Sequence, residues 1–226
     1  MIVHLPRLLL ALLLLWFPRP WMRLGFTFLR RRRRRSGAEA PAIEPWNARE
    51  SGDPRLSFRE EFSKFRNYLD LLRGAAGSLA LSGGLSIPPG ISAVAGASRG
   101  TVWQTIIIRA LILLVGLLAQ TMRFERNKVT FYPPIFYLAG VSVGLCDIRG
   151  AGFAFLMVWA INPMFGNAQG FLTIYAIFMV GFGHLFAGTG DLSAVYAGIL
   201  ALLPVLLSLL SNRPLTVFSR KSTRTA

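Results

Sequence analysis

The fold is decided by residues Val129–Ser211, which read VTFYPPIFYLAGVSVGLCDIRGAGFAFLMVWAINPMFGNAQGFLTIYAIFMVGFGHLFAGTGDLSAVYAGILALLPVLLSLLS. Only three residues in this stretch carry a charge, namely Asp147, Arg149 and Asp191. The preceding run from Thr101 is nearly as apolar, and water would not tolerate so much contiguous apolar surface. The sequence therefore predicts an all-α fold, a polytopic helical bundle in a membrane.

The composition agrees with a membrane protein and argues against an ordinary soluble domain. Hydrophobic residues make up 53% of the 226 residues, and the mean hydropathy is +0.49. Charged residues make up 15%, against about 25% in soluble domains. The net charge is +15, and since three of the 25 basic residues are lysine, 22 are arginine. These basic residues flank the apolar spans, as expected for cytoplasmic segments that face anionic lipid.

Six consecutive arginines form the most basic segment of the chain. A basic run can bind nucleic acid, but such a patch usually accompanies a folded nucleic-acid-binding domain or interleaved aromatic residues. This run instead follows an apolar stretch and precedes a polar linker, which favours the anionic headgroups of the bilayer as its partner over nucleic acid. The predicted lipid contacts are Arg30, Arg31, Arg32, Arg33, Arg34 and Arg35.

The N-terminal region leaves two alternatives open. Within residues 1–22, Leu8–Phe17 is an apolar run that is short for a membrane span. The heavy positive charge follows this run rather than preceding it, unlike a cleaved secretory signal. Residues 1–22 are therefore either a short anchor with its N-terminus outside, or a misassigned start with Met22 as the true first residue. Residues 23–56 are predicted to be the basic run and a flexible linker.

Residues 57–73 predict a single amphipathic helix. Ser57 and Glu60 form a capping box at its start, and Gly74 is placed to stop it. Two interpretations remain: the helix packs on the protein's own bundle, or it lies in the membrane interface and contacts lipid or a partner subunit. The predicted contact stripe consists of Phe58, Phe62, Phe65, Leu69 and Leu72.

Residues 74–211 are predicted to form the transmembrane bundle. Its crossings are 74–98, a broken or hairpin element, followed by 103–122, 130–146, 152–165, 171–188 and 193–210. The basic loop Arg123–Lys128 and the basic tail 212–226 should both be cytoplasmic. Four spans separate them, so they return to the same side. Parity then requires 74–98 to cross as well, which gives six crossings after residue 73.

This topology gathers most of the ionisable residues of the bundle at the outer face. Arg109 is costly in lipid, and we expect Asp147 and Asp191 to be its partners in an intramembrane polar cluster. Cys146 and His184 could act as a nucleophile and its base, with Arg149 beside them, so these three are the candidate catalytic residues. The structural alternative is a buried apolar cysteine next to polar turns. A single cysteine excludes an intrachain disulfide, and the sequence predicts no metal site and identifies no cofactor.

The order Cys146, Arg149, His184 at one face resembles the Cys/Arg/His set of exosortase-type membrane transpeptidases. It departs from that set because here the cysteine and arginine are three residues apart in one loop instead of on separate helices. The resemblance covers these three residues only, and no family assignment is based on it.

Three classes of function fit these features. We favour a non-catalytic subunit or assembly factor of a membrane complex, with other membrane subunits as partners. The alternatives are a small transporter or channel, and a membrane-embedded enzyme that acts on a lipid-linked substrate through Cys146 and His184. Arginine dominance and the lack of disulfides favour a bacterial inner membrane with the C-terminus in the cytoplasm; an organelle membrane is the alternative.

Overall fold

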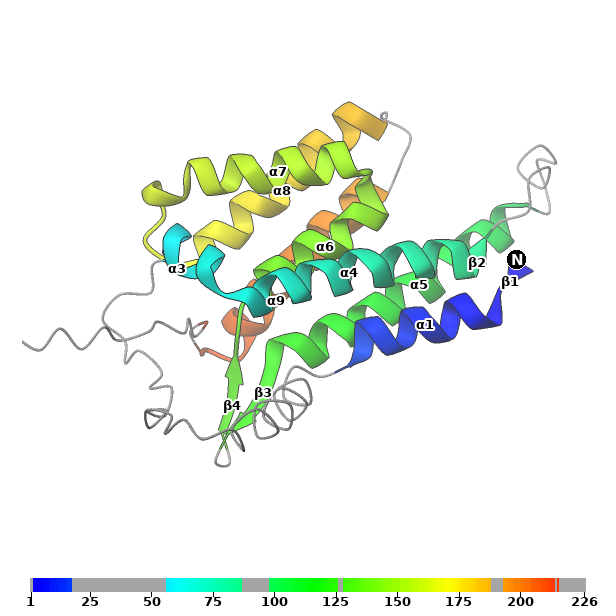
Figure 1. Ribbon diagram of the computed structural model, residues 1–226, viewed down its shortest axis with the longest axis horizontal. Coiled ribbons are helices and arrows are strands. Elements are labelled where there is room, and N and C mark those ends of the chain that lie inside the picture. The colour runs from blue at the N-terminus through cyan, green and yellow to red at the C-terminus, as the bar shows by residue number, and fades with distance from the viewer. Residues whose placement is uncertain are drawn as a thin grey trace, which may run out of the picture.

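The computed structural model describes residues 2–17, 56–86, 98–125, 128–187, 193–213 and 215. These residues form eight α-helices, one 3-10 turn and two small antiparallel sheets (Figure 1). The helices are α1 (Leu5–Trp16), α3 (Phe58–Ser63), α4 (Phe65–Gly84), α5 (Ser98–Thr121), α6 (Ile135–Cys146), α7 (Ile148–Ala160), α8 (Ala168–Ala187) and α9 (Ser193–Leu210), with the 3-10 turn η2 (Asn162–Met164) after α7. The strands are β1 (Ile2–Val3), paired with β2 (Leu85–Ser86), and β3 (Met122–Glu125), paired with β4 (Lys128–Phe131).

Three of the described helices are long and apolar enough to cross a membrane, fewer than the six crossings predicted. They lie at Trp103–Thr121 in α5, Ala168–Phe186 in α8 and Ser193–Leu210 in α9. The apolar helices α1, α6 and α7 have 12, 12 and 13 residues, about 18–20 Å of helix against a hydrocarbon core of about 30 Å. The all-helical bundle is thus confirmed, and its three long helices are compatible with a membrane.

Consecutive helices from α4 to α9 alternate in direction. α4 and α6 run parallel, because Ser78 Oγ lies 3.5 Å from Gly140 O and Ser82 Oγ lies 3.3 Å from Gly144 O. α5 runs back between them in the chain, and α1 lies antiparallel to α4 (Figure 1). The His4 amide therefore donates to Gly84 O at the far end of α4.

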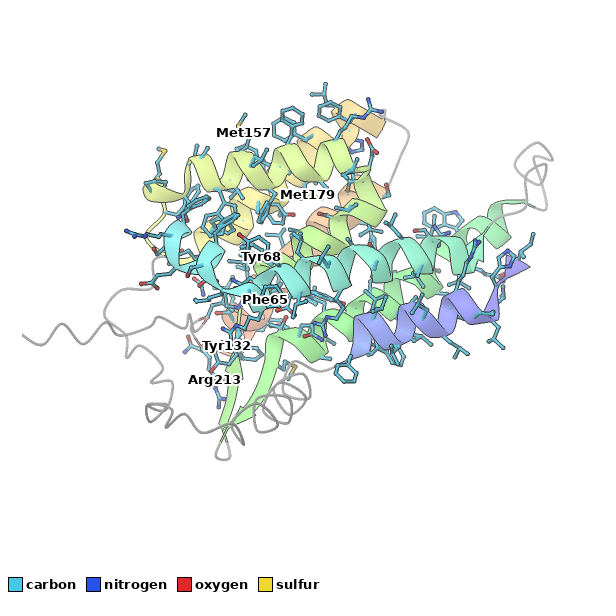
Figure 2. All side chains as sticks on the ribbon, in the orientation of Figure 1. Phe65, Tyr68, Tyr132, Met157, Met179 and Arg213 are labelled. Atoms are coloured by element: carbon cyan, nitrogen blue, oxygen red, sulfur yellow. The ribbon has the colours of Figure 1, made fainter. Side chains whose placement is uncertain are left out.

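The bundle consequently has two ends. The end that we call the hairpin end holds Phe17, Leu56, Arg73, Gln120, the β3–β4 hairpin, Asn162, Gln169, Ser208 and Arg213. The opposite end, called the turn end, holds His4, Leu85, Cys146, Gly150, Gly183 and Ser193. A parallel bridge joins Phe131 to Leu215, so the hairpin and the segment after α9 lie at the same end, as the parity argument expects (Figure 2).

The predicted helix 57–73 is corrected in two respects. Ser57 is the N-cap, and its Oγ accepts from the Glu60 amide at 3.5 Å, but the helix breaks at Lys64, where φ is −86° and ψ is 103°. After the break α4 continues through Gly74 to Gly84. Gly74 does not end the helix. Its lack of a side chain instead allows α6 to approach closely, since a Cβ on Gly74 would lie 2.6 Å from the carbonyl oxygen of Tyr137 in α6.

The first half of α4 is polar inside and apolar outside. Asn67, Asp70 and Arg73 are buried, whereas Phe65 and Leu72 are exposed. This orientation is expected in hydrocarbon, where polar groups turn toward protein and apolar side chains face lipid. The predicted contact stripe is therefore divided: Phe62 stacks inward against other rings, Leu69 is half-buried, and the outward-facing members are Phe58, Phe65 and Leu72.

The structure of residues 74–98 also differs from the predicted broken or hairpin element. Its first part is the second half of α4, followed by β2, and α5 begins at Ser98. The Pro88-Pro89-Gly90 sequence lies outside the described residues. The other crossings shift by a few residues, and α9 has the predicted bounds, Ser193–Leu210.

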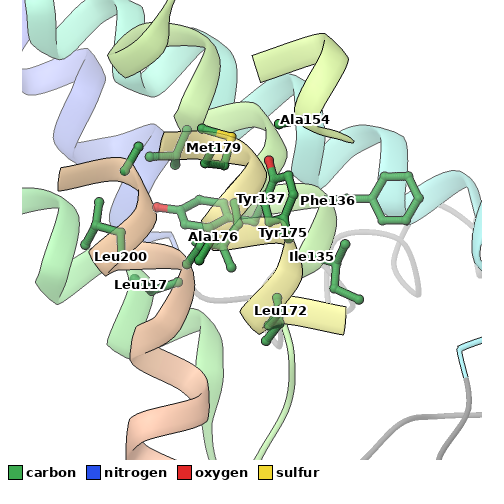
Figure 3. Packing of buried hydrophobic residues seen from close by; sticks show 14 of the residues in the cluster. Leu117, Ile135, Phe136, Tyr137, Ala154, Leu172, Tyr175, Ala176, Met179 and Leu200 are labelled. Atoms are coloured by element: carbon green, nitrogen blue, oxygen red, sulfur yellow. The ribbon is translucent and has the colours of Figure 1, made fainter. Parts of the chain in front are cut away.

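Helix α6 is the central helix of the bundle. Residues 135–142 are all buried. Phe136 packs against the rings of Phe62 and Phe155 and points away from Tyr175 of α8 (Figure 3), whereas Ser142 Oγ lies 3.2 Å from the Tyr175 hydroxyl. Gly140 of α6 faces the Leu71 carbonyl of α4 so closely that no Cβ would fit between them. Small residues let backbones approach in this way, and such seams hold helices together in lipid, where the hydrophobic effect does not.

Candidate functional site: a buried polar cluster between α1, α4 and α5

An ion pair is buried near the hairpin end of α4. Asp70 and Arg73 are one helical turn apart, and Arg73 Nη2 lies 3.1 Å from Asp70 Oδ1. The Asp70 side chain is 1% exposed and the Arg73 side chain 8% exposed. Charges this deep are retained only when they are paired and hydrogen-bonded, so the surroundings of Arg73 decide what the pair does.

Hydrogen bonds connect Arg73 of this ion pair to α5 and to the end of α1. Arg73 Nη2 donates to Gln120 Oε1 at 2.9 Å, and Arg73 Nη1 donates to the carbonyl of Phe17. Gln120 Nε2 donates to the same Phe17 carbonyl at 3.1 Å. Phe17 is the C-cap of α1, where helical carbonyls lack partners within the helix. The cluster therefore caps a helix end inside the protein.

Tyr137 of α6 completes the cluster. The Arg73 guanidinium lies over its ring, 5.3 Å from the centroid, which is within the range of a cation–π contact. The Tyr137 hydroxyl donates to the carbonyl of Leu15 at 3.1 Å. Helices α4, α5 and α6 thus all direct polar groups to the last turn of α1. We call Asp70, Arg73, Gln120 and Tyr137 the helix-end cluster.

Sequence reasoning missed Asp70 and Gln120 as members of a site. Asp70 and Arg73 fall within the segment interpreted as an interfacial helix, where charged residues are ordinary. Gln120 is one of two amides within Trp103–Thr121, the other being Gln104, and an amide in an apolar span usually hydrogen-bonds across helices. The Gln120 amide was the available signal for a polar contact between helices.

Arg109, predicted to pair with Asp147 and Asp191, instead caps α4. Its Nη2 donates to the carbonyls of Ser82, at 2.9 Å, and of Leu85. A cation at a helix C-terminus satisfies free carbonyls and is favoured by the helix dipole. The predicted ion pair between Arg109 and Asp147 is not formed: Arg109 binds the end of α4, and Asp147 pairs with Arg149.

Asp147 and Arg149 pair with each other at the turn end. Arg149 Nε lies 3.4 Å from Asp147 Oδ2, with 74% of the Arg149 side chain and 43% of the Asp147 side chain exposed. Asp147 is the only residue between α6 and α7 and has a φ of 68°, a region that favours glycine. Asp191 lies outside the described residues.

Cys146 and the segment Gly183-His184 come together at the turn end. Cys146 is fully buried, with its Sγ 4.0 Å from Ser193 O and 3.6 Å from the position that a Cβ on Gly183 would take. His184 Nδ1 is buried and has no hydrogen-bond partner among the described residues. The tight contact places Cys146 beside the helix turn that carries His184.

Within the part of the chain that the structure describes, no group of three His, Cys, Asp or Glu side chains is placed to hold a metal ion. The predicted lipid contacts Arg30–Arg35 lie outside this part.

In comparisons with known proteins, no family model, no curated protein and no solved structure matches this chain.

Proposed function

We propose that this chain is an integral membrane protein that serves as a non-catalytic subunit or assembly factor of a membrane complex. Helices α4–α9 are its six crossings, and the hairpin end faces the cytoplasm of a bacterial inner membrane. The alternating helix directions and the shared end of the β3–β4 hairpin and the C-terminal segment support this topology. The basic sequence of both segments supports the cytoplasmic assignment.

The outer surface of the described bundle supports membrane embedding. Large apolar side chains are exposed on every outward-facing helix, including Leu9 on α1, Leu72 on α4, Ile107 on α5, Leu156 on α7 and Leu206 on α9. Exposed side chains of this size over a whole bundle would associate in water and are stable against hydrocarbon.

The observation that supports a structural role is that the buried polar side chains bind other helices of the same chain. Arg73, Gln120 and Arg109 lie at depths where a polar side chain is a functional candidate by default. Each of them binds a carbonyl at the end of a neighbouring helix of the same chain. These groups hold the bundle together, as expected of a protein whose task is to present a defined surface to other membrane subunits.

Purification of the tagged chain in mild detergent, with identification of the proteins that elute with it, tests this proposal. A membrane subunit should carry one or more proteins in fixed stoichiometry, and Cys146→Ser and His184→Ala should leave that stoichiometry unchanged. A chain that elutes alone from membranes under several mild detergents contradicts the proposal.

A membrane-embedded enzyme is a second candidate. The contact between Cys146 and Gly183, together with the buried Nδ1 of His184, favours it. Its substrate would be a lipid-linked molecule at the outer face. In that case Cys146→Ser or His184→Ala should abolish turnover of such a substrate while the protein remains folded. The transporter alternative would use the broken element 74–98 and the Pro-kinked spans around Arg109, Asp147 and Asp191; in the structure Arg109 and Asp147 bind different partners.

A further inference from the structure

Helix α1 lies in a groove whose glycines meet both main-chain and side-chain atoms of the helix at close range. The groove is formed by α4 and α5, and three of its glycines face α1: a Cβ on Gly77 would lie 2.8 Å from Leu15, one on Gly84 would lie 2.9 Å from the Leu8 amide, and one on Gly116 would lie 3.2 Å from the Leu15 carbonyl. The Gly84 contact and the Leu15 carbonyl contact of Gly116 depend on close approach of main-chain atoms, whereas Gly77 gives room for the Leu15 side chain. The groove therefore suits an apolar helix with a leucine at that position.

The polar contacts of α1 are made almost entirely through its main chain. At its start, Ile2 and Val3 pair with β2 and the His4 amide donates to Gly84 O at 2.8 Å. At its end, the helix-end cluster binds the carbonyls of Leu15 and Phe17. The exception is the Trp16 indole, which donates to Ile112 O at 2.9 Å.

The attachment of α1 is peripheral. Only Ala11 and Leu15 of its 12 residues are buried, whereas nine of the 12 residues of α6 are buried. In lipid the exposed leucines of α1 provide no hydrophobic driving force for docking. Helix α1 must therefore be held by its packing in the groove and by the contacts at its two ends. Residues 18–55 separate α1 from the next described segment in the sequence, so a short chain connection does not force the docking.

The helix-end cluster is unusually polar for a site whose occupant is a leucine-rich helix. An arginine, a carboxylate and an amide at this depth are costly in lipid unless a helix end satisfies them. We propose that the groove between α4 and α5 is a binding site for an apolar transmembrane helix whose last carbonyls meet Arg73 and Gln120. In the isolated chain α1 is its occupant, and a partner protein's helix of the same kind takes its place. This inference rests on the proposed role as a complex subunit and names the class of partner.

Disulfide trapping of a synthetic helix tests the site in the purified full chain. The probe is a peptide with the sequence of Ile2–Phe17 and the change Leu14→Cys, added to the Gly77→Cys, Cys146→Ser chain in phosphatidylcholine–phosphatidylglycerol vesicles. Leu14 Cβ lies 3.3 Å from the position of a Cβ on Gly77, close to the separation of about 3.5–4.5 Å in disulfides. The expected result is a peptide–protein disulfide. Its yield should rise several-fold when Leu15→Ala weakens the chain's own α1, and should fall several-fold with Gln120→Leu.

The matched control places the cysteine at Leu79, which is also on α4 but is exposed on the lipid side. That chain should give about tenfold less disulfide. If Gly77→Cys does not yield a monodisperse protein, Gly116→Cys with a Trp16→Cys peptide reports the same groove, since a Cβ there lies 3.4 Å from Trp16 Cδ1.

Two outcomes overturn the inference. One is the absence of any disulfide at the groove even with Leu15→Ala, which makes α1 a permanent element. The other is an equal yield at Leu79, which makes the association non-specific. The assay uses no partner protein, so its failure is distinct from a failure to recover partner subunits during native purification.

Discussion

Gly74 of α4 lies so close to Tyr137 of α6 that a Cβ would be 2.6 Å from the Tyr137 carbonyl oxygen. The oxygen belongs to rigid helical backbone and cannot move aside. We expect Gly74→Ala to destabilise the protein by about 1–3 kcal/mol through overpacking. Thermal unfolding in detergent measures this. Gly181→Ala is the control, because a Cβ at Gly181 in α8 meets nothing within 4 Å; that change should be neutral or stabilising by up to about 1 kcal/mol. Equal destabilisation of the two variants would show that the α4–α6 seam is not tightly packed.

The Asp70–Arg73 pair gives a prediction of non-additivity. Removing one partner leaves the other charge buried, so Asp70→Leu or Arg73→Leu should each cost about 3–5 kcal/mol. The double variant should be more stable than Arg73→Leu alone, because no uncompensated carboxylate remains. A double-mutant cycle on thermal unfolding measures the coupling. Additive losses would mean that the two charges do not depend on each other.

The corner at Asp147 predicts a stabilising substitution. A non-glycine residue with a φ of 68° and a ψ of 147° is strained, and glycine adopts this conformation without a Cβ clash. Asp147→Gly should therefore raise stability by about 0.5–1 kcal/mol even though the exposed ion pair with Arg149 is lost, since such pairs contribute little. Asp147→Ala removes the same ion pair and keeps the strain, so it is the matched control. If both variants lose stability to the same extent, the ion pair outweighs the strain.

The packing of α1 against α4 and α5 gives a prediction for the two interpretations of the N-terminus, a chain that begins at Met1 or one that begins at Met22. A chain that begins at Met22 lacks α1, so the Arg73 and Gln120 side chains lose the Phe17 carbonyl. We expect this shorter form to unfold at a lower temperature than the form that begins at Met1. The difference should shrink in the Gln120→Leu background, where part of the contact is already missing. Indistinguishable unfolding of the two forms would mean that α1 does not dock.

Much of the architecture was predictable from the sequence, because apolar spans and basic flanking segments can be located from residue type without knowledge of the side-chain packing. Residues Ser193–Leu210 were expected as a span and form α9, and the basic loop and tail were expected at one end, where Phe131 and Leu215 meet. Ser57 was also predicted correctly as the residue that caps the start of a helix.

The course of α4 was not predictable by the same rules. Gly74 has the sequence signature of a helix stop, but the helix continues because α6 needs the space of its missing side chain. The apolar stripe of residues 58–72 left open whether the helix packs on the bundle or contacts lipid or a partner. The structure buries Asp70 and Arg73 and exposes Phe65 and Leu72, an orientation that suits hydrocarbon and that an apolar stripe alone does not specify. The site around Phe17 depends on a contact between segments far apart in the chain, and no local pattern encodes it.

Single-cysteine labelling in intact cells tests the membrane topology most directly. In a Cys146→Ser background, Ile148→Cys at the turn end and Arg213→Cys at the hairpin end each place one thiol at an exposed position. A membrane-impermeant maleimide should label position 148 in intact cells and position 213 only after the membrane is opened. Labelling of both positions under the same condition would contradict a bundle that spans the membrane with its two ends on opposite sides.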